Sequence, residues 1–283
     1  MIRILVAVCG VYVYLICPKL RHRCNMKPFS EQPIAHRGIH DNKTIAENSM
    51  TAFRKAVEAG YGIELDVRFT KDRRMVVFHD DDLNRMCGDP RLVSDVTYNE
   101  LKNIPLRHSG ETIPTLREVL DVVNGQVPLL IEMKSGISAA MDIPIRLAQE
   151  MKHYKGIYSV ESFNPLYIRK YRKLDKDIAC GVLSTKFPKV KLKQKPLAIV
   201  LENLLMNFLA KPDFIAYQYT DCKKISFRLN RLLGAATVAW TIPQGKAIGE
   251  RAKKSFDAFI CDISDPAGML DLPDSGTRTP VTE

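Results

Sequence analysis

The fold is decided by the stretch Gly62-Ile63-Glu64-Leu65-Asp66-Val67-Arg68-Phe69. Successive side chains of a β-strand point to opposite faces, so Ile63, Leu65 and Val67 share one face while Glu64 and Asp66 share the other. A layer of helices would cover the apolar face and leave both carboxylates pointing inward. This pattern is typical of a strand in a closed barrel whose outer face is covered by helices.

Short apolar runs recur along the chain and alternate with stretches of helical spacing, for example residues 47–60, 166–174 and 225–233. The other strand candidates are residues 34–36, 128–133, 158–163, 178–183, 214–219, 236–242 and 257–263. Residues 75–78 are set aside as half of an inserted hairpin. Eight strands alternating with helices in about 250 residues have the size of a (β/α)₈ barrel. An open doubly wound sheet would also alternate, but no Gly-x-Gly-x-x-Gly turn follows the first strand. We therefore predict an α/β fold, a (β/α)₈ TIM barrel with a small inserted segment after the second strand.

Composition narrows the function classes. The 283 residues are 46% hydrophobic and 26% charged, which predicts a folded core, and the formal net charge is +10. An excess of positive charge favours partners that carry phosphate. The chain has one tryptophan and no nucleic-acid motif, so we expect no nucleic-acid partner. Its seven cysteines are irregularly spaced without a Cys-x-x-Cys pair, which argues against a disulfide framework or a zinc site.

The amino-terminal residues are expected to form a segment separate from the barrel. Residues 4–17 are uncharged and mostly apolar, although a full membrane span needs about 20 residues. No small-x-small cleavage site follows, which favours an uncleaved anchor over the alternative, a signal peptide. More positively charged residues follow this apolar run than precede it, so we expect the main domain in the cytoplasm. The predicted order is a hydrophobic anchor helix that meets membrane lipid (1–18), a linker (19–31), the barrel (32–272) and a flexible tail (273–283).

Polar residues end several of the predicted strands, where a barrel places its chemistry. His36 and Arg37 end the first strand, and His79 ends the inserted hairpin. The other residues of this kind are Glu64 and Asp66 on the second strand, Glu132 and Lys134 after the third, Glu161 and Ser162 after the fourth, Trp240 on the seventh and Asp262 on the eighth. Carboxylates at this spacing suit a hard divalent cation, and histidine exchanges protons near neutral pH. The pattern predicts a metal-dependent hydrolase with one shared pocket.

Together these residues resemble the glycerophosphodiester phosphodiesterase family from about residue 33 to 266. The matching motifs are His36-Arg37-Gly38, Glu47-Asn48-Ser49, Glu64-Leu65-Asp66-Val67, Thr70-Lys71-Asp72, Val76-Val77-Phe78-His79-Asp80, Arg85 with Gly88, Glu132-Met133-Lys134 and Ser162-Phe163. The resemblance implies a TIM barrel with an inserted segment. It also implies hydrolysis of a glycerophosphodiester to glycerol 3-phosphate and an alcohol, in phospholipid or glycerol metabolism.

The resemblance further implies a role for each candidate. One divalent cation, Mg²⁺ or Ca²⁺, would be held by Glu64, Asp66 and Glu132. His36 and His79 would form the acid–base pair. The residues expected around them are Arg37 and Lys134 near the phosphate, Trp240 against the substrate and Glu47 behind the groups that touch metal or substrate. For Lys134 the alternative is a structural partner of a carboxylate, and for Trp240 it is the hydrophobic core.

Similarity assigns His36 as base and His79 as acid, while the residues alone fit the reverse order equally well. They also fit either direct attack by water or attack by a glycerol hydroxyl that gives a cyclic phosphate. The family usually reads Thr-Asp-x-Pro where this chain has Cys261-Asp262-Ile263-Ser264, which leaves the role of that last segment open. Two other functions remain as alternatives: a lysophospholipase D that cleaves membrane lysophospholipids, and an inactive membrane-tethered binding module.

Overall fold

The computed structural model describes residues 1–20, 26–135, 142–187, 194–246 and 249–266. Eight parallel strands form a closed barrel, because β1 pairs with both β2 and β9. The strands are β1 (Ile34–Ile39), β2 (Gly62–Phe69), β4 (Leu129–Met133), β5 (Tyr158–Ser162), β6 (Cys180–Ser184), β7 (Phe214–Gln218), β8 (Ala236–Ile242) and β9 (Ala258–Ile263). The predicted TIM barrel is confirmed, and each predicted strand overlaps an observed one.

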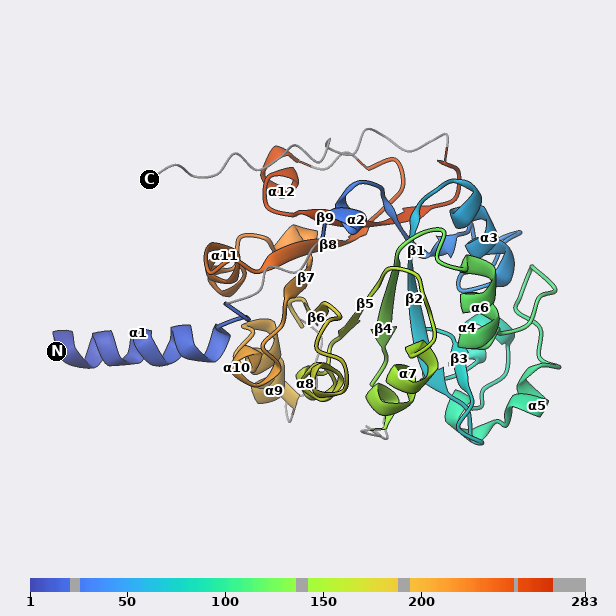
Figure 1. Ribbon diagram of the computed structural model, residues 1–283, viewed down its shortest axis with the longest axis horizontal. Helices are drawn as coiled ribbons and strands as arrows, with labels where there is room; N and C mark the ends of the chain where they lie inside the picture. The colour runs from blue at the N-terminus through green and yellow to red at the C-terminus, as the bar shows by residue number, and fades with distance from the viewer. Residues whose placement is uncertain (21–25, 136–141, 188–193, 247–248, 267–283) are drawn as a thin grey trace.

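Helices cover the outside of the barrel (Figure 1). They are α3 (Met50–Glu58), α6 (Leu116–Val123), α7 (Ile143–Met151), α8 (Pro165–Leu174), α9 (Lys195–Glu202), α10 (Asn207–Ala210), α11 (Ile225–Leu232) and α12 (Glu250–Lys253). The outer face of β2 packs into the large cluster between strands and helices, where Ile63, Leu65 and Val67 are fully buried. A second apolar cluster that includes Leu130, Phe214 and Val238 fills the barrel interior. The alternation of β2 therefore leaves Glu64 and Asp66 on the inner face, as predicted.

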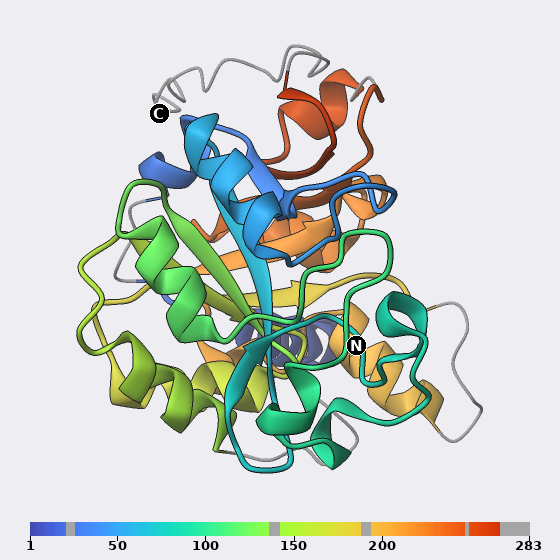
Figure 2. The ribbon, with the colours of Figure 1, turned by 90° about the vertical axis from the view of Figure 1, so that its right-hand side faces the viewer.

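The inserted segment follows β2 and has a small core of its own. β3 (Met75–Val77) pairs antiparallel with β2, which is the predicted hairpin. Two single-turn helices, α4 (Asn84–Cys87) and α5 (Tyr98–Leu101), follow it, with a short 3₁₀ turn between them (Val93–Asp95). Their apolar residues form a separate buried cluster around Phe78. Figure 2 shows this segment, in teal, on the side of the barrel that also carries α3 and α6.

The amino-terminal run forms α1 (Ile2–Ile16), which leaves the barrel and contacts it only near its own carboxyl end (Figure 1). There Ile16 is buried, the Tyr14 ring lies 5.6 Å from that of Phe208, and Asn207 Nδ2 donates to the Ile16 carbonyl. Fifteen helical residues span about 22 Å, against about 30 Å for the apolar core of a bilayer. Within the described residues no helix has both the length and the apolarity to cross a membrane. The predicted membrane-spanning anchor is therefore not supported.

Part of the segment between α1 and the barrel packs against the barrel. Helix α2 (Lys27–Ser30) places Phe29 in the cluster that fills the barrel interior, where Phe29 is 2% exposed. Lys19 pairs with Asp213 at 2.9 Å, just before β7. The flexible tail predicted for residues 273–283 lies outside the described residues.

Candidate active site

Three carboxylates converge in the barrel. Glu64 and Asp66 come from β2 and Glu132 comes from β4, whose register places Glu132 beside Asp66. One oxygen atom from each carboxylate lies within 4.8 Å of the other two, and all three residues are buried. Close oxygen donors of this kind form the ligand set of a hard divalent cation. These residues therefore fit the predicted ion, which would be held by all three.

Two cationic side chains neutralise part of this cluster. Lys134 Nζ lies 2.9 Å from Asp66 Oδ1 and 2.7 Å from Glu132 Oε2, and Arg37 Nε lies 3.3 Å from Asp66 Oδ2. Burial alone would raise the pKa of Asp66, but the charges of Lys134 and Arg37 hold it well below its usual range. For Glu64, burial and then the charge of Asp66 raise the pKa well above its usual range. The cluster therefore still favours additional positive charge.

A kink in β1 brings Arg37 to the cluster. Arg37 has a φ of 59° and Gly38 a φ of 81°, and the register between β1 and β9 shifts at this point. The Arg37 backbone N–H donates to Glu64 Oε2 at 3.1 Å. A Cβ atom on residue 38 would lie 2.8 Å from the Ala52 carbonyl carbon, so both the φ angle and the space require glycine. The kink thus fixes the backbone donor against the carboxylate.

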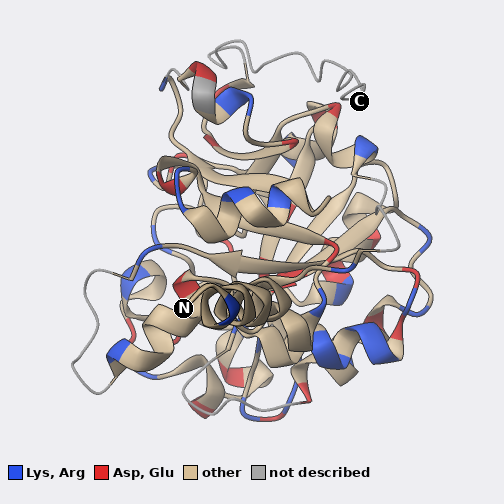
Figure 3. Ribbon diagram, turned by 90° about the vertical axis from the view of Figure 1, so that its left-hand side faces the viewer, with Lys and Arg blue, Asp and Glu red and all other residues tan. Residues whose placement is uncertain are grey.

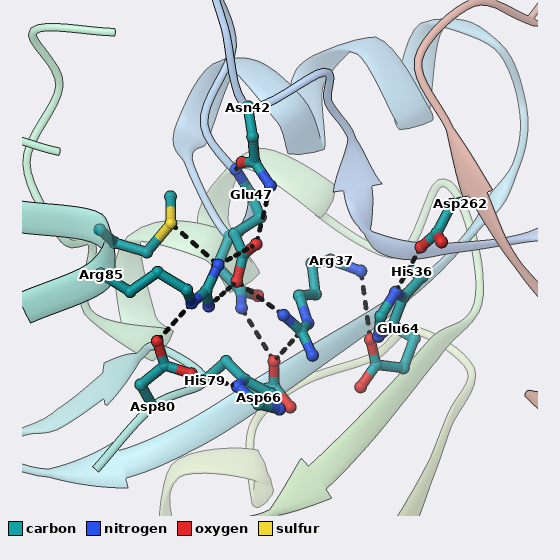
Figure 4. A network of polar contacts seen from close by, with 12 residues as sticks. His36, Arg37, Asn42, Glu47, Glu64, Asp66, His79, Asp80, Arg85 and Asp262 are labelled. Carbon is teal, nitrogen blue, oxygen red and sulfur yellow. Dashed lines mark hydrogen bonds and ion pairs between the residues drawn. The ribbon is translucent and has the colours of Figure 1, made fainter. Parts of the chain in front are cut away.

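Glu47 lies behind Arg37 and holds two arginines (Figure 4). Its Oε1 accepts from Arg37 Nη1 at 2.7 Å and from Arg85 Nη2 at 2.6 Å, and its Oε2 accepts from Arg85 Nη1 at 2.8 Å and from Asn42 Nδ2 at 2.9 Å. Burial would raise the pKa of Glu47, but the hydrogen bonds from Arg85 and the charge of Arg37 lower it far below its usual range. Glu47 is therefore ionised and fixes the guanidinium of Arg37.

His79 reaches the site from the inserted segment. Its Nδ1 lies 2.6 Å from Asp80 Oδ1, and Asp80 Oδ2 accepts from Arg85 Nε at 2.6 Å. Arg68 donates twice to the main-chain carbonyl of His79, at 2.8 and 2.6 Å. Burial lowers the pKa of His79 to about 4, against the opposing charge of Asp66. The ring is therefore neutral at pH 7 in the substrate-free protein.

His36 is held in a similar way from the other side of the barrel mouth. Its Nδ1 lies 2.7 Å from Asp262 Oδ1 on β9, and the register of β1 places it beside Glu64. In both histidines Nδ1 is hydrogen-bonded to a carboxylate, so Nε2 is the ring nitrogen that remains to contact a substrate. Figure 4 shows the two imidazoles on opposite sides of Arg37.

Trp240 belongs to the inner face of β8. Its ring packs edge-on against that of Phe163, with 5.5 Å between centroids, and it contacts the cluster that fills the barrel interior. Its buried indole Nε1 has no hydrogen-bond partner among the described residues. Trp240 therefore combines the predicted place on an inner wall with an unused donor.

Sequence reasoning gave no individual role to Asp80, Arg85, Asp262 or Glu161. The signal for Asp80 was its position directly after His79, and the signal for Asp262 was its place at the end of a predicted strand. These positions do not show that either carboxylate bonds an imidazole. For Asp262 the partner, His36, is 226 residues away in the sequence. Glu161 lies on β5, beside Glu132 of β4, and is 1% exposed.

The sequence and the fold of this chain are both similar to those of known proteins. The model of the family described as glycerophosphoryl diester phosphodiesterase matches residues 36–262. A glycerophosphodiester phosphodiesterase from Caldanaerobacter subterraneus subsp. tengcongensis is 30% identical over 256 residues, which cover 86% of this chain and 98% of that protein. A lysophospholipase D from Rattus norvegicus is 31% identical over 157 residues, 51% of this chain and 48% of that protein. The crystal structure of an Oleispira antarctica phosphodiesterase in complex with sn-glycerol-3-phosphate superposes with a TM-score of 0.67 at 24% identity and covers 83% of this chain and 94% of that one, which is a likeness of fold.

Proposed function

The chain belongs to the glycerophosphoryl diester phosphodiesterase family and is a phosphodiester hydrolase, and from this premise we propose that it cleaves glycerophosphodiesters to glycerol 3-phosphate and an alcohol. The observation that carries the proposal is the convergence of the carboxylates Glu64, Asp66 and Glu132 with two histidines that each bond a carboxylate through Nδ1. A binding module would not need two imidazoles held in this way.

We propose that Glu64, Asp66 and Glu132 hold one Mg²⁺ or Ca²⁺ ion. Bound there, a divalent cation neutralises charge on the phosphoryl oxygens and orients the groups that enter and leave. The chain's own cations complete the phosphate site. Arg37, which Glu47 holds in place, and Lys134 supply positive charge beside the carboxylates. Lys134 also serves as the structural partner of Asp66 and Glu132, so the two readings of this residue are compatible.

We propose that His36 accepts the proton of the attacking group, water or a glycerol hydroxyl, and that His79 donates a proton to the departing oxygen. Each such transfer is typically worth about 10²–10⁴ in rate. Because the pKa of His79 is lowered to about 4 in the substrate-free protein, this order requires the anionic diester to raise that pKa on binding. In His36→Ala, where His36 no longer titrates, kcat/KM should fall as the pH rises above about 4 if His79 is the acid, and should fall as the pH drops below about 4 if His79 is the base.

The direct test measures release of glycerol 3-phosphate from glycerophosphocholine, with and without EDTA, by the wild type, His36→Ala and His79→Ala. We expect activity that is lost with chelation, restored by Mg²⁺ or Ca²⁺, and reduced at least 100-fold in each variant, in line with the rate that a proton-transfer group contributes. Absence of hydrolysis with any diester and ion would refute the proposal and favour the binding module.

A second candidate is attachment to a membrane and cleavage of lysophospholipids there. Apart from Arg3, helix α1 has no charged residue, and its apolar side chains are exposed: Ile2 is 78% exposed, Val6 is 65% exposed and Val11 is 59% exposed. Figure 3, which looks along α1, shows the helix almost entirely in tan. An apolar helix with no polar face is disfavoured in water. We propose that it inserts into the near leaflet of a bilayer without crossing it, with the barrel in the cytoplasm.

Vesicle flotation tests the attachment. The wild type is expected to float with vesicles that contain anionic lipid, and Leu5→Glu with Val8→Glu, which changes exposed positions of α1, is expected to stay behind. Equal flotation of both proteins would refute the role of α1. Release of choline from lysophosphatidylcholine at a rate comparable to that from glycerophosphocholine would favour the lysophospholipase reading, and release only from the water-soluble diester would exclude it.

A further inference from the structure

A fourth carboxylate lies beside the three that have been assigned to the ion. Glu161 is on β5, one strand further around the barrel, and the register of the two strands pairs it with Glu132. The preceding residue, Val160, belongs to the outer cluster between strands and helices, so Glu161 points to the inner face. The two carboxylates therefore lie side by side on the inner wall of the barrel.

Glu161 has no evident structural task. It is 1% exposed, and its Oε2 atom has no hydrogen-bond partner among the described residues. A buried carboxylate without a partner is costly and is usually paired or bound to a metal. On the next strand its neighbour is Gly181, and the Phe214 ring takes the space that a side chain there would need. Gly181 and Phe214 therefore offer Glu161 no polar side chain, whereas Glu132 on the other neighbouring strand belongs to the carboxylate cluster.

The charges of the cluster agree with this reading. Two cations, Arg37 and Lys134, contact the carboxylates of the cluster. The inward-facing carboxylates on the three adjacent strands are Glu64, Asp66, Glu132 and Glu161. Once all four carboxylates are ionised, these two cations leave two negative charges, which is the charge that one divalent ion neutralises.

We propose that Glu161 contributes a fourth carboxylate to the ion held by Glu64, Asp66 and Glu132, and that it makes the site prefer Ca²⁺ to Mg²⁺. Ca²⁺ takes about six to eight oxygen ligands in flexible geometry, whereas Mg²⁺ requires a near-ideal octahedron and keeps several waters. Glu161 lies outside the three-residue set whose oxygens are within 4.8 Å of one another. An additional, more distant carboxylate suits the larger ion, because its ligand number and ligand distances vary more.

The inference rests on the proposed ion site, and calorimetric titration of metal-free protein with CaCl₂ or MgCl₂ tests both. The wild type is compared with Glu161→Gln, which keeps the size of the side chain and removes its charge, and with Glu58→Gln on the exposed surface of α3 as a matched control. We expect Glu161→Gln to weaken Ca²⁺ binding at least tenfold and Mg²⁺ binding less than threefold. Glu58→Gln should leave both affinities within twofold of the wild type.

The outcomes are distinguishable. If both ions bind the wild type and Glu161→Gln changes neither affinity, the role of Glu161 is refuted and the ion site stands. If Glu161→Gln weakens both ions equally, the preference for Ca²⁺ that is assigned to Glu161 is refuted. If neither ion binds the wild type, the ion site fails as well. Thermal unfolding shows whether the variant is intact: without metal it should melt at or above the wild-type temperature, because a neutral amide costs less to bury than a carboxylate. Added CaCl₂ should then raise its melting temperature less than that of the wild type.

Discussion

Asp80 is a residue at which the structure predicts a measurable loss of activity from a small chemical change. Its Oδ1 lies 2.6 Å from His79 Nδ1, and its Oδ2 accepts from Arg85 Nε at 2.6 Å. The carboxylate fixes the orientation of the imidazole and raises the pKa of His79, in opposition to burial. Asp80→Asn keeps the shape of the side chain and removes its charge. It should therefore leave His79 less firmly oriented and harder to protonate.

The size of the effect follows from the bond that is lost. A hydrogen bond to a charged group contributes about 1.5–3 kcal/mol. The Asp80 side chain is 22% exposed, so we take the lower half of that range, about 1.5–2.2 kcal/mol. At 1.4 kcal/mol for each factor of ten, kcat should fall roughly 10- to 40-fold. Thermal unfolding should change little, because the amide oxygen of the variant side chain can still accept from Arg85.

The neighbouring carboxylate supplies the control. Asp81 Oδ1 accepts from Arg68 Nη1 at 2.6 Å, and no hydrogen bond joins Asp81 to an imidazole of the described residues. Asp81→Asn removes a charge of the same sign one residue away, so it should reduce kcat less than threefold. The assay is the rate of glycerol 3-phosphate release from glycerophosphocholine at saturating substrate. An Asp80→Asn enzyme within twofold of the wild type, or an equal loss in both variants, would show that Asp80 does not act through His79.

Three further results are expected. Glu47→Ala should lower the free energy of unfolding by about 2–4 kcal/mol in urea titrations, because it leaves partly buried Arg37 and half-exposed Arg85 without their carboxylate; a loss below 1 kcal/mol would contradict this expectation. Because burial lowers the pKa of His79 from 6.5 to about 4, the folded state favours the neutral ring, so this contribution to stability is complete above pH 6.5 and is lost as the pH falls toward 4. Unfolding of His79→Gln should accordingly depend less on pH across that window than unfolding of the wild type. Finally, binding of the divalent ion should release protons, because the pKa values of Glu64 and Glu132 are raised, mainly by burial; titrations in buffers of different ionisation enthalpy should give different apparent heats, and identical heats would contradict this.

The barrel was accessible from the sequence because its strands are buried on both faces. The alternation of Ile63, Leu65 and Val67 with Glu64 and Asp66 shows which side chains face the helices and which face the interior. Local patterns were less reliable at the ends of elements. The helix predicted from residue 47 begins at Met50, with Ser49 Oγ accepting from the Ala52 N–H. Asn48 has a φ of 55° and its side chain donates to Asp66, so tertiary contacts take the residues before the helix away from it.

For the site too, features that depend on one strand could be predicted, and contacts between distant parts of the chain could not. The spacing of Glu64 and Asp66 indicates an ion site because both lie on one strand, and the structure brings Glu132, the third predicted ligand, beside them from the adjacent strand. The bond between His36 and Asp262 was out of reach, because it joins the first and last strands of the barrel and depends on closure of the sheet. The membrane span was predicted from apolar residues alone, and the helix they form is too short to supply it.

Both histidines bond a carboxylate through Nδ1, but the inserted segment gives His79 the less exposed partner. The His36 partner, Asp262, is 45% exposed, whereas the His79 partner, Asp80, is 22% exposed and is also held by Arg85. Both His79 and Arg85 come from the segment that follows β2, and Arg85 continues to Glu47, which holds Arg37 on β1. A barrel without this segment would keep the carboxylates and His36 but lose His79 and the second cation on Glu47. The insertion therefore supplies one of the two imidazoles proposed to transfer protons and, through Arg85 and Glu47, links the position of that imidazole to the guanidinium of Arg37.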